Sequence, residues 1–230
     1  MKTIKNFINK IFFKFGYRIS KINNSHELFK IYKYKNLKQY IKTQVYFNKK
    51  KIDQVWADEL NLKKISFFLK KNFKKKYLTG VCHGSRNGFE QKKLMQLLPK
   101  SKIIGTNISP TALCYPHTIQ HDFHKKKWIA HFDFVYSNSL DQSYNPKLAL
   151  TIWLQQIIKD GFVVLEHSEQ SGIIGQGKMD PFGVEANFFP YVLSDWFGHK
   201  ISISMIKSIK KNKSNSLIWI FFIKKLYKDN

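Results

Sequence analysis

Residues 77–90, with the sequence YLTGVCHGSRNGFE, constrain the fold more than any other stretch of the chain. A short run fit for a buried strand leads into a loop that contains Gly84 and Gly88, and apolar residues at roughly helical spacing follow it. Glycine lets the backbone approach a ligand closely, and the free N–H groups at the start of a helix favour the ligand's polar edge. The stretch therefore predicts a strand, a glycine turn and a helix that cradle a nucleotide-like ligand.

Four further apolar runs alternate with helical segments along the chain. They occupy residues 102–110, 118–123, 132–138 and 161–167. Strands that alternate with helices are typical of a doubly wound α/β sheet, which is the fold class we expect. Near the end of the chain, residues 201–205 and 216–223 are joined by a polar turn and predict a hairpin.

Asn107 is the candidate ribose-binding residue. It ends the second apolar run, 23 positions after Gly84. Sheets of this type place a ribose-binding side chain at the end of the second strand, about 20 residues after the glycine turn. The spacing therefore supports a nucleotide-like ligand at this edge of the sheet.

Four segments of the chain, taken together, resemble the successive motifs of class I S-adenosylmethionine-dependent methyltransferases. They are residues 82–88 (CHGSRNG), 105–110 (GTNISP), 132–137 (FDFVYS) and 159–166 (KDGFVVLE), in the order and spacing of that family. The resemblance covers about residues 75–225. It implies a Rossmann-like seven-stranded sheet closed by a C-terminal antiparallel hairpin, with S-adenosylmethionine as the cofactor.

The resemblance also implies a set of cofactor-binding residues. They are His83, Gly84, Arg86, Gly88, Asn107, Ile108, Asp122, Ser137 and Asn138. Asp122 occupies the place of an acidic residue that often meets the adenine amino group in this family. The chain departs from the family at Thr79 and Gly80, where an acidic residue is usual near the end of the first strand. It departs again at Asn107, whose amide can bond a ribose hydroxyl without the charge-assisted strength of the usual carboxylate.

His167 is the candidate general base, because it follows the fifth strand on the side where such a fold opens its cleft. A neutral imidazole there has a pKa suited to taking a hydroxyl proton near neutral pH. Asp141, after the fourth strand, is the rival base or a substrate-orienting group. The Asn/Asp-Pro-Pro-aromatic tetrapeptide associated with transfer to an exocyclic base amine is absent from the sequence. We therefore expect O-methylation of a small polar molecule or a glycan.

The charge of the chain leaves two other functions open. The formal net charge is +25, and a charge of this size is typical of a protein with a polyanionic partner. However, only Arg18 and Arg86 of the 40 basic residues are arginines, and arginine is the residue that proteins favour for reading nucleic acid. An RNA methyltransferase or RNA-binding protein is thus an alternative that the sequence does not favour. A non-catalytic relative of the fold is the other alternative, because Thr79 and Asn107 depart from the family.

Residues 1–51 form a basic extension that precedes the methyltransferase-like domain at residues 52–230. Within residues 1–22 the apolar side chains fall on one helical face, which either packs on the protein or lies on an anionic membrane surface. The pattern of residues 23–51 predicts no particular structure. Lysines interrupt any N-terminal signal sequence, and the apolar run at residues 217–223 is too short to span a bilayer. A cytoplasmic protein, peripheral to the membrane if the N-terminal helix binds lipid, is the expectation.

Cysteines and histidines do not predict a metal site. The chain has two cysteines, too few for a disulfide framework, and neither has the spacing of a metal-binding pair. His117 and His121 lie in a run that predicts extended chain, where they would be about 13 Å apart. That separation is too large for one zinc ion.

Overall fold

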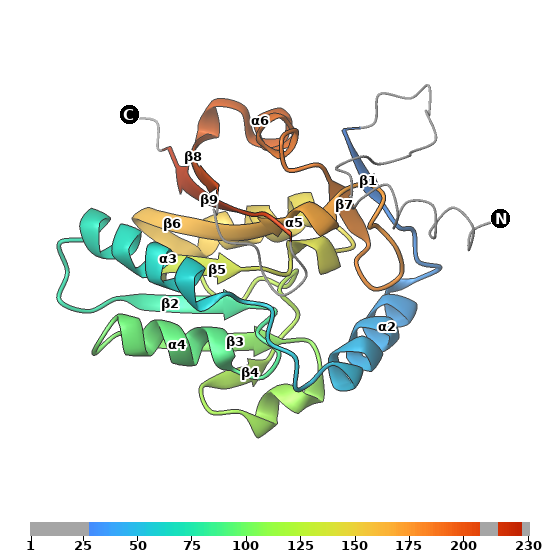
Figure 1. Ribbon diagram of the computed structural model, residues 1–230, viewed down its shortest axis with the longest axis horizontal. Coiled ribbons are helices and arrows are strands. Elements are labelled where there is room, and N and C mark those ends of the chain that lie inside the picture. The colour runs from blue at the N-terminus through green and yellow to red at the C-terminus, as the bar shows by residue number, and fades with distance from the viewer. Residues whose placement is uncertain (1–27, 208–215, 227–230) are drawn as a thin grey trace.

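A computed structural model describes residues 28–207 and 216–226 of the chain. Its centre is a seven-stranded sheet with the strand order β4-β3-β2-β5-β6-β9-β8 (Figure 1). The strands are β2 (Thr79–His83), β3 (Lys102–Asn107), β4 (Thr118–Gln120), β5 (Phe132–Ser137), β6 (Ile157–Ser168), β8 (Ile201–Lys207) and β9 (Ile218–Lys225). β2 to β6 run parallel, whereas β9 is antiparallel to both β6 and β8. The predicted doubly wound sheet with a C-terminal antiparallel hairpin is confirmed.

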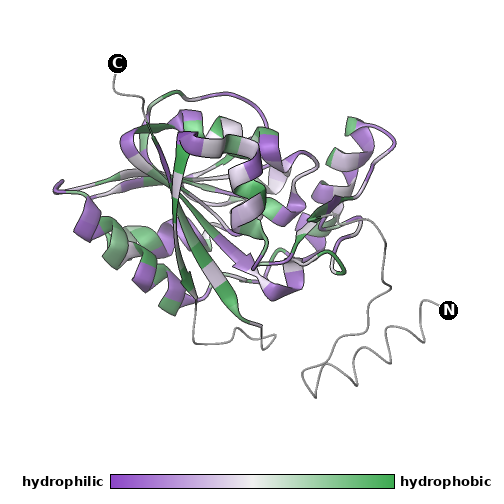
Figure 2. Ribbon diagram, turned by 90° about the horizontal axis from the view of Figure 1, so that it is seen from above, coloured by the Kyte–Doolittle hydropathy of each residue, from purple (hydrophilic) through white to green (hydrophobic). Residues whose placement is uncertain are grey.

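Helices cover both faces of the sheet. On one face α3 (Glu59–Asn72) and α4 (Phe89–Leu97) bury Leu62, Ile65 and Leu94 against the strands. On the other face lie α5 (Pro146–Gln156) and α6 (Phe189–Phe197). Figure 2 shows hydrophobic residues gathered in the central strands and hydrophilic residues along the outer sides of the helices. Burial of each large aliphatic side chain contributes about 1.5–3 kcal/mol, so the two layers of core hold the strand ends in fixed positions.

Gly80 shows how tightly the first layer is packed. A Cβ atom at this position would collide with the ring of Phe134 on the neighbouring strand β5. Phe134 is itself fully buried. Glycine at position 80 therefore serves the contact between β2 and β5. Next to it, at the start of these strands, the carboxylate of Asp133 accepts hydrogen bonds from the backbone N–H and the hydroxyl of Thr79.

The segment before residue 52 is joined to the rest of the protein. A short strand, β1 (Phe29–Ile31), pairs antiparallel with β7 (Phe182–Val184), and α2 (Leu37–Lys50) follows it. α2 begins at Asn36, whose side chain accepts a hydrogen bond from the backbone N–H of Gln39 at 2.9 Å. The helix predicted within residues 1–22 lies outside the described residues.

Element boundaries differ from the predictions where polar side chains end an element. A helix was expected at residues 52–73, but α3 begins at Glu59 because Asp58 caps its first turn through the N–H of Leu60. The strand expected at residues 118–123 ends at Gln120, which places Asp122 in a turn. No helix in the described part of the chain is long and apolar enough to cross a membrane.

Candidate functional site

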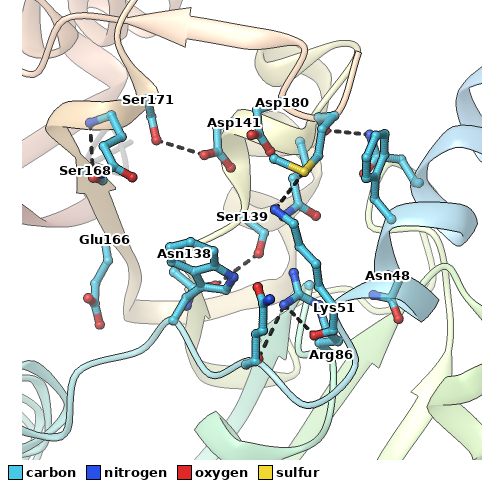
Figure 3. Close-up of a pocket in the computed structure, with 18 of the residues that line it drawn as sticks. Asn48, Lys51, Arg86, Asn138, Ser139, Asp141, Glu166, Ser168, Ser171 and Asp180 are labelled. Atoms are coloured by element: carbon cyan, nitrogen blue, oxygen red, sulfur yellow. Dashed lines mark hydrogen bonds between the residues drawn. The ribbon is translucent and has the colours of Figure 1, made fainter. Parts of the chain in front are cut away.

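The carboxyl ends of β2, β5 and β6 surround a cavity of about 180 Å³, which we call the outer cavity (Figure 3). α2 and the loop at residues 176–181 close its far side. Ligands of open α/β sheets bind at this edge, outside the carboxyl ends of the strands. The outer cavity therefore lies where the sequence predicts the ligand.

The turn from β2 to α4 forms the floor of this site. Gly84 and Gly88 both have φ of +77°, a conformation that L side chains rarely adopt. A Cβ atom on Gly84 would also lie 2.5 Å from the Cβ of Ser139, which follows β5. Gly88 is the N-cap of α4 and has no side-chain cap, so it leaves N–H groups at the helix start unsatisfied by a side chain. Both glycines are required by the backbone, as predicted, and Gly84 lines the outer cavity.

Arg86 connects this turn to the segment after α2. Its Nη1 donates hydrogen bonds to the carbonyl oxygens of Lys51, at 3.1 Å, and Gln54, at 3.3 Å. Its Nε is buried and has no hydrogen-bond partner. Arg86 and Asn138, two of the sequence-predicted cofactor residues, both line the outer cavity.

A second, much smaller cavity adjoins the first, and we call it the inner cavity. It is lined by the predicted nucleoside-binding residues Asn107, Ile108 and Asp122, and it has a volume of about 20 Å³. The two cavities share Gly84, Gln142 and two α2 residues, Gln44 and Asn48. The structure thus brings the predicted nucleoside residues together, beside the outer cavity.

The polar groups of the inner cavity are held in place by local hydrogen bonds. The Oδ1 atom of Asn107 accepts a bond from the backbone N–H of Ser109 at 2.8 Å, which leaves the amide nitrogen for the cavity. Asp122 accepts two bonds from His124, one from the backbone and one from Nδ1 at 2.8 Å. Although burial acts to raise the pKa of Asp122, these bonds from His124 lower it below its usual value. Asp122 is therefore an ionised acceptor at neutral pH.

Three predicted cofactor residues do not line either cavity. His83 is buried inside the sheet, where its ring nitrogens contact Thr106 Oγ1 and Gln156 Oε1, both at 2.8 Å. Burial lowers the pKa of His83 to about 3. Ser137 donates its hydroxyl to the carbonyl of His83, and Gly88 acts through the backbone turn alone. Because strand side chains alternate between faces, a residue one position before the glycine turn points into the core.

The prediction that His167 is the general base is corrected by its position. His167 is buried, its Nε2 lies 2.9 Å from the carbonyl oxygen of Val184, and it does not line the outer cavity. Burial lowers its pKa to about 4, so its basicity is lost as well. Glu166, one residue earlier in β6, faces the cavity instead.

Asp141, the rival base, does line the outer cavity. Its Oδ2 accepts a hydrogen bond from the hydroxyl of Ser171 at 2.8 Å, whereas its Oδ1 is buried and has no hydrogen-bond partner among the residues that the structure describes. Burial, with a contribution from the neighbouring carboxylate of Asp180, raises the pKa of Asp141 to about 7. Figure 3 shows the two aspartates side by side above the cavity. A carboxyl group with one free oxygen and this pKa is suited to accept a proton near neutral pH.

Glu166 and Glu90 are the other carboxyl groups of the outer cavity, and both are engaged. Glu166 accepts hydrogen bonds from the hydroxyl of Tyr136, at 2.8 Å, and from the amide of Asn61, at 3.1 Å. Glu90 accepts one from the hydroxyl of Ser85 at 3.0 Å. Burial raises the pKa of Glu166 to about 7 and raises that of Glu90 as well. Since both oxygens of Glu166 are occupied, Asp141 is the better placed proton acceptor.

Sequence reasoning did not single out Lys51, Glu90, Glu166 or Asp180, all of which line the outer cavity. Glu90 follows the glycine turn and Glu166 ends the segment that resembles a family motif. The sequence therefore predicts that both segments lie near the ligand, but it does not assign a role to either glutamate. Lys51 and Asp180 lie in segments without a recognisable motif. Only the fold places them at the site.

Comparisons with known proteins support the fold. No family model and no curated protein sequence matches the chain. Among solved structures, the plantazolicin methyltransferase BpumL, crystallised with a desmethylPZN analog and SAH, is 12% identical with a TM-score of 0.64 over 82% of this chain and 96% of that one. The 1,6-didemethyltoxoflavin-N1-methyltransferase of Burkholderia thailandensis is 10% identical with a TM-score of 0.64 over 90% and 99%.

The same fold also occurs in a cyclase. The [4+2]-cyclase SpnF is 11% identical to this chain, with a TM-score of 0.55 over 71% of this chain and 81% of that one. At these identities the likeness concerns the fold. The chain has the fold of class I methyltransferases, as its motifs predicted.

Proposed function

We propose that the protein is an S-adenosylmethionine-dependent methyltransferase that methylates an oxygen of a small polar acceptor. The observation that carries this proposal is the pair of adjoining cavities at the carboxyl edge of the sheet. The inner one is lined by Asn107 and Asp122, and the outer one is lined by Asp141, whose Oδ1 is buried and accepts no hydrogen bond from the described residues. One suits a nucleoside and the other an acceptor whose proton must be removed.

The residues present fit the methyl donor by their chemistry. Asn107 and Asp122 offer an amide and a carboxylate to the hydroxyl and amino groups of an adenosine, and Gly84 leaves room for close backbone approach. Arg86 and Asn138 flank the turn on the side of the outer cavity, where the amino-acid end of the donor would lie. When bound, the donor supplies a methyl group already activated by its positive sulfonium.

The inner cavity must widen to accept an adenosine. Its volume of about 20 Å³ is close to that of a single water molecule. The side chains that fill the space come from α2, namely Tyr40, Gln44 and Asn48. Binding of the donor therefore requires these α2 side chains to move away from the turn at Gly84.

Asp141 is the proton acceptor in this proposal. The acceptor's hydroxyl would give its proton to Oδ1 of Asp141, which Ser171 holds in place through Oδ2, while its oxygen takes the methyl group and the carbon–sulfur bond of the donor breaks. Positioning supplies most of the rate in such a transfer, and a positioned base adds about 10²–10⁴-fold. Four carboxyl groups and only two basic side chains line the outer cavity, a balance that favours a small acceptor over the phosphate backbone of RNA.

Calorimetry with S-adenosylhomocysteine tests the donor site. Gly84→Val and Ile108→Trp should each abolish binding, the first by blocking backbone approach and the second by filling the inner cavity. Gly177→Val is the matched control, because a Cβ atom at Gly177 meets nothing within 4 Å. Equal affinity in wild type and in Ile108→Trp, with the variant shown to be folded by thermal unfolding, would place the site elsewhere.

The chemistry is tested by transfer of labelled methyl groups to a panel of hydroxyl-bearing small molecules. Asp141→Asn should lower turnover by about 100-fold or more while it leaves affinity for S-adenosylhomocysteine unchanged. Retained turnover in this variant would mean that alignment alone drives the reaction and that Asp141 is not the base.

A further inference from the structure

Acidic residues are concentrated in the outer cavity of a strongly basic protein. The chain has 15 acidic and 40 basic residues, yet the outer cavity has four acidic residues and two basic ones. The acidic residues are Glu90, Asp141, Glu166 and Asp180. The cavity therefore reverses the charge balance of the rest of the molecule, and a site of this kind raises the local concentration of positively charged ligands.

The two basic residues of the outer cavity do not neutralise the four carboxyl groups. Within residues 28–207 and 216–226, none of these carboxyl groups forms a salt bridge with Lys51 or Arg86. Arg86 donates to two backbone carbonyl oxygens. The ammonium of Lys51 lies 2.9 Å from the sulfur of Met179 and 5.4 Å from the centre of the Trp56 ring.

The outer cavity has a buried carboxyl oxygen that accepts no hydrogen bond from the described residues. Oδ1 of Asp141 is such an atom, and it lies beside the carboxylate of Asp180. An unsatisfied buried acceptor costs free energy that a ligand can recover by donating a hydrogen bond. Burial raises the pKa of both aspartates, and at Asp180 the charges of Lys51 and Arg86 offset this effect only in part. A donor with a positive charge satisfies both groups at once.

We propose that the acceptor is a cationic amino alcohol, whose protonated amine binds Asp180 and whose hydroxyl lies at Oδ1 of Asp141. This inference rests on the proposed methyl transfer and names the class of its substrate. A hydroxyl next to an ammonium group delivers its proton to Asp141 while Asp180 keeps the charge of the amine compensated. No group of three or more His, Cys, Asp or Glu side chains in the described ranges is arranged to hold a metal ion. An organic cation is therefore the ligand that we expect at Asp141 and Asp180.

The ammonium of the methyl donor does not account for Asp180. Glu90 and Asn138 lie next to the glycine turn, joined by a hydrogen bond of 3.4 Å, and they serve that end of the cavity. Asp180 belongs instead to the loop that closes the far side, next to Met179. Loading the protein with S-adenosylhomocysteine, which carries the same ammonium, separates the two roles in an experiment.

Three two-carbon hydroxyl compounds that differ in charge test the inference. Ethanolamine is positive, ethylene glycol is neutral and glycolate is negative, and each is added to protein saturated with S-adenosylhomocysteine at pH 8 and equal ionic strength. Ethanolamine should raise the melting temperature by about 3–6 °C at tenfold excess over its Kd, and the other two should not. Asp180→Asn should abolish this shift. Asp195→Asn, which removes an exposed carboxylate on α6, should retain it.

Three outcomes would overturn the inference. A shift with glycolate and none with ethanolamine would mean that Lys51 and Arg86 select an anionic acceptor. If ethanolamine still raises the melting temperature of Asp180→Asn, or if none of the three compounds raises that of the wild type, the acidic residues of the outer cavity do not bind an amine. Failure of the proposed methyl transfer itself is seen separately, as absent binding of S-adenosylhomocysteine in calorimetry before any amine is added.

Discussion

Glu166→Gln is expected to change how the free energy of unfolding depends on pH. The size of the change measures how strongly burial in the outer cavity raises the pKa of Glu166. Glu166 is only 7% exposed, and burial raises its pKa from the ordinary value of 4.5 to about 7. At about 1.4 kcal/mol per pKa unit, this difference corresponds to roughly 3 kcal/mol. The folded protein loses that amount when Glu166 ionises.

The direction of this pH dependence follows from the number of protons that the folded and the unfolded chain bind. Below about pH 4.5, Glu166 is protonated in both the folded and the unfolded chain, so it gives no pH-dependent difference. As the pH rises from there to about 7, the unfolded chain releases the proton while the folded protein keeps it, and the free energy of unfolding of the wild type falls. Glutamine does not titrate. Relative to wild type, the variant should therefore gain about 3 kcal/mol between pH 4 and pH 8.

Urea unfolding followed by tryptophan fluorescence, at several pH values from 4 to 8, measures this difference. Glutamine keeps an oxygen for Tyr136 but turns its amide nitrogen toward the amide of Asn61, which costs about 1 kcal/mol at every pH and does not affect the slope. Asp195→Asn controls for the change in net charge. A difference between Glu166→Gln and wild type that stays constant over the whole pH range would refute the reasoning.

Other expected outcomes concern the donor site and the corrected base. Asn107→Asp should tighten binding of S-adenosylhomocysteine by about 1 kcal/mol, or about fivefold in calorimetry, because a carboxylate accepts from ribose hydroxyls more strongly; weaker binding would count against a ribose contact. His167→Ala should lower the free energy of unfolding by about 3 kcal/mol and leave turnover unchanged, since the ring is buried away from the cavity. Asn48→Ala removes a hydrogen bond from Thr111 to α2 and should speed association of S-adenosylhomocysteine by about fivefold in stopped flow, whereas an unchanged rate would show that α2 does not limit entry. Deleting residues 1–22 should abolish sedimentation with anionic vesicles. Wild-type protein that does not sediment with them would contradict membrane binding by this segment.

The sheet could be predicted because its strands carry strong local signals. β3 and β5 are apolar runs that end in a polar residue, and the glycine turn after β2 has a conformation that few residues other than glycine adopt. The order of these signals along the chain is enough to place Gly84, Asn107 and Asp141 at one edge. All three line one of the two cavities, as do the predicted residues Arg86, Ile108, Asp122 and Asn138.

His167 does not face the outer cavity because strand residues alternate between the two faces of the sheet. Glu166 and His167 are neighbours in β6, and a shift of one residue decides which of them faces the cavity. Chemistry favoured the histidine, since its ordinary pKa lies near neutrality and that of a glutamate does not. Burial reverses this order, with a pKa of about 4 for His167 and about 7 for Glu166. The local sequence does not show which residue of β6 faces the cavity, nor how deeply each side chain is buried.

α2 escaped prediction for a reason connected to its role. A helix is recognised in sequence by an apolar stripe, and in α2 the buried positions are Tyr40, Gln44 and Asn48, two of which are amides. These side chains are spaced four residues apart, so they form one face, and all three line the inner cavity. A helix that covers a polar ligand site must present polar side chains to it. These side chains occupy the positions that are apolar in other helices, so no apolar stripe is visible. The absence of a clear stripe in residues 37–50 thus follows from their position over the site.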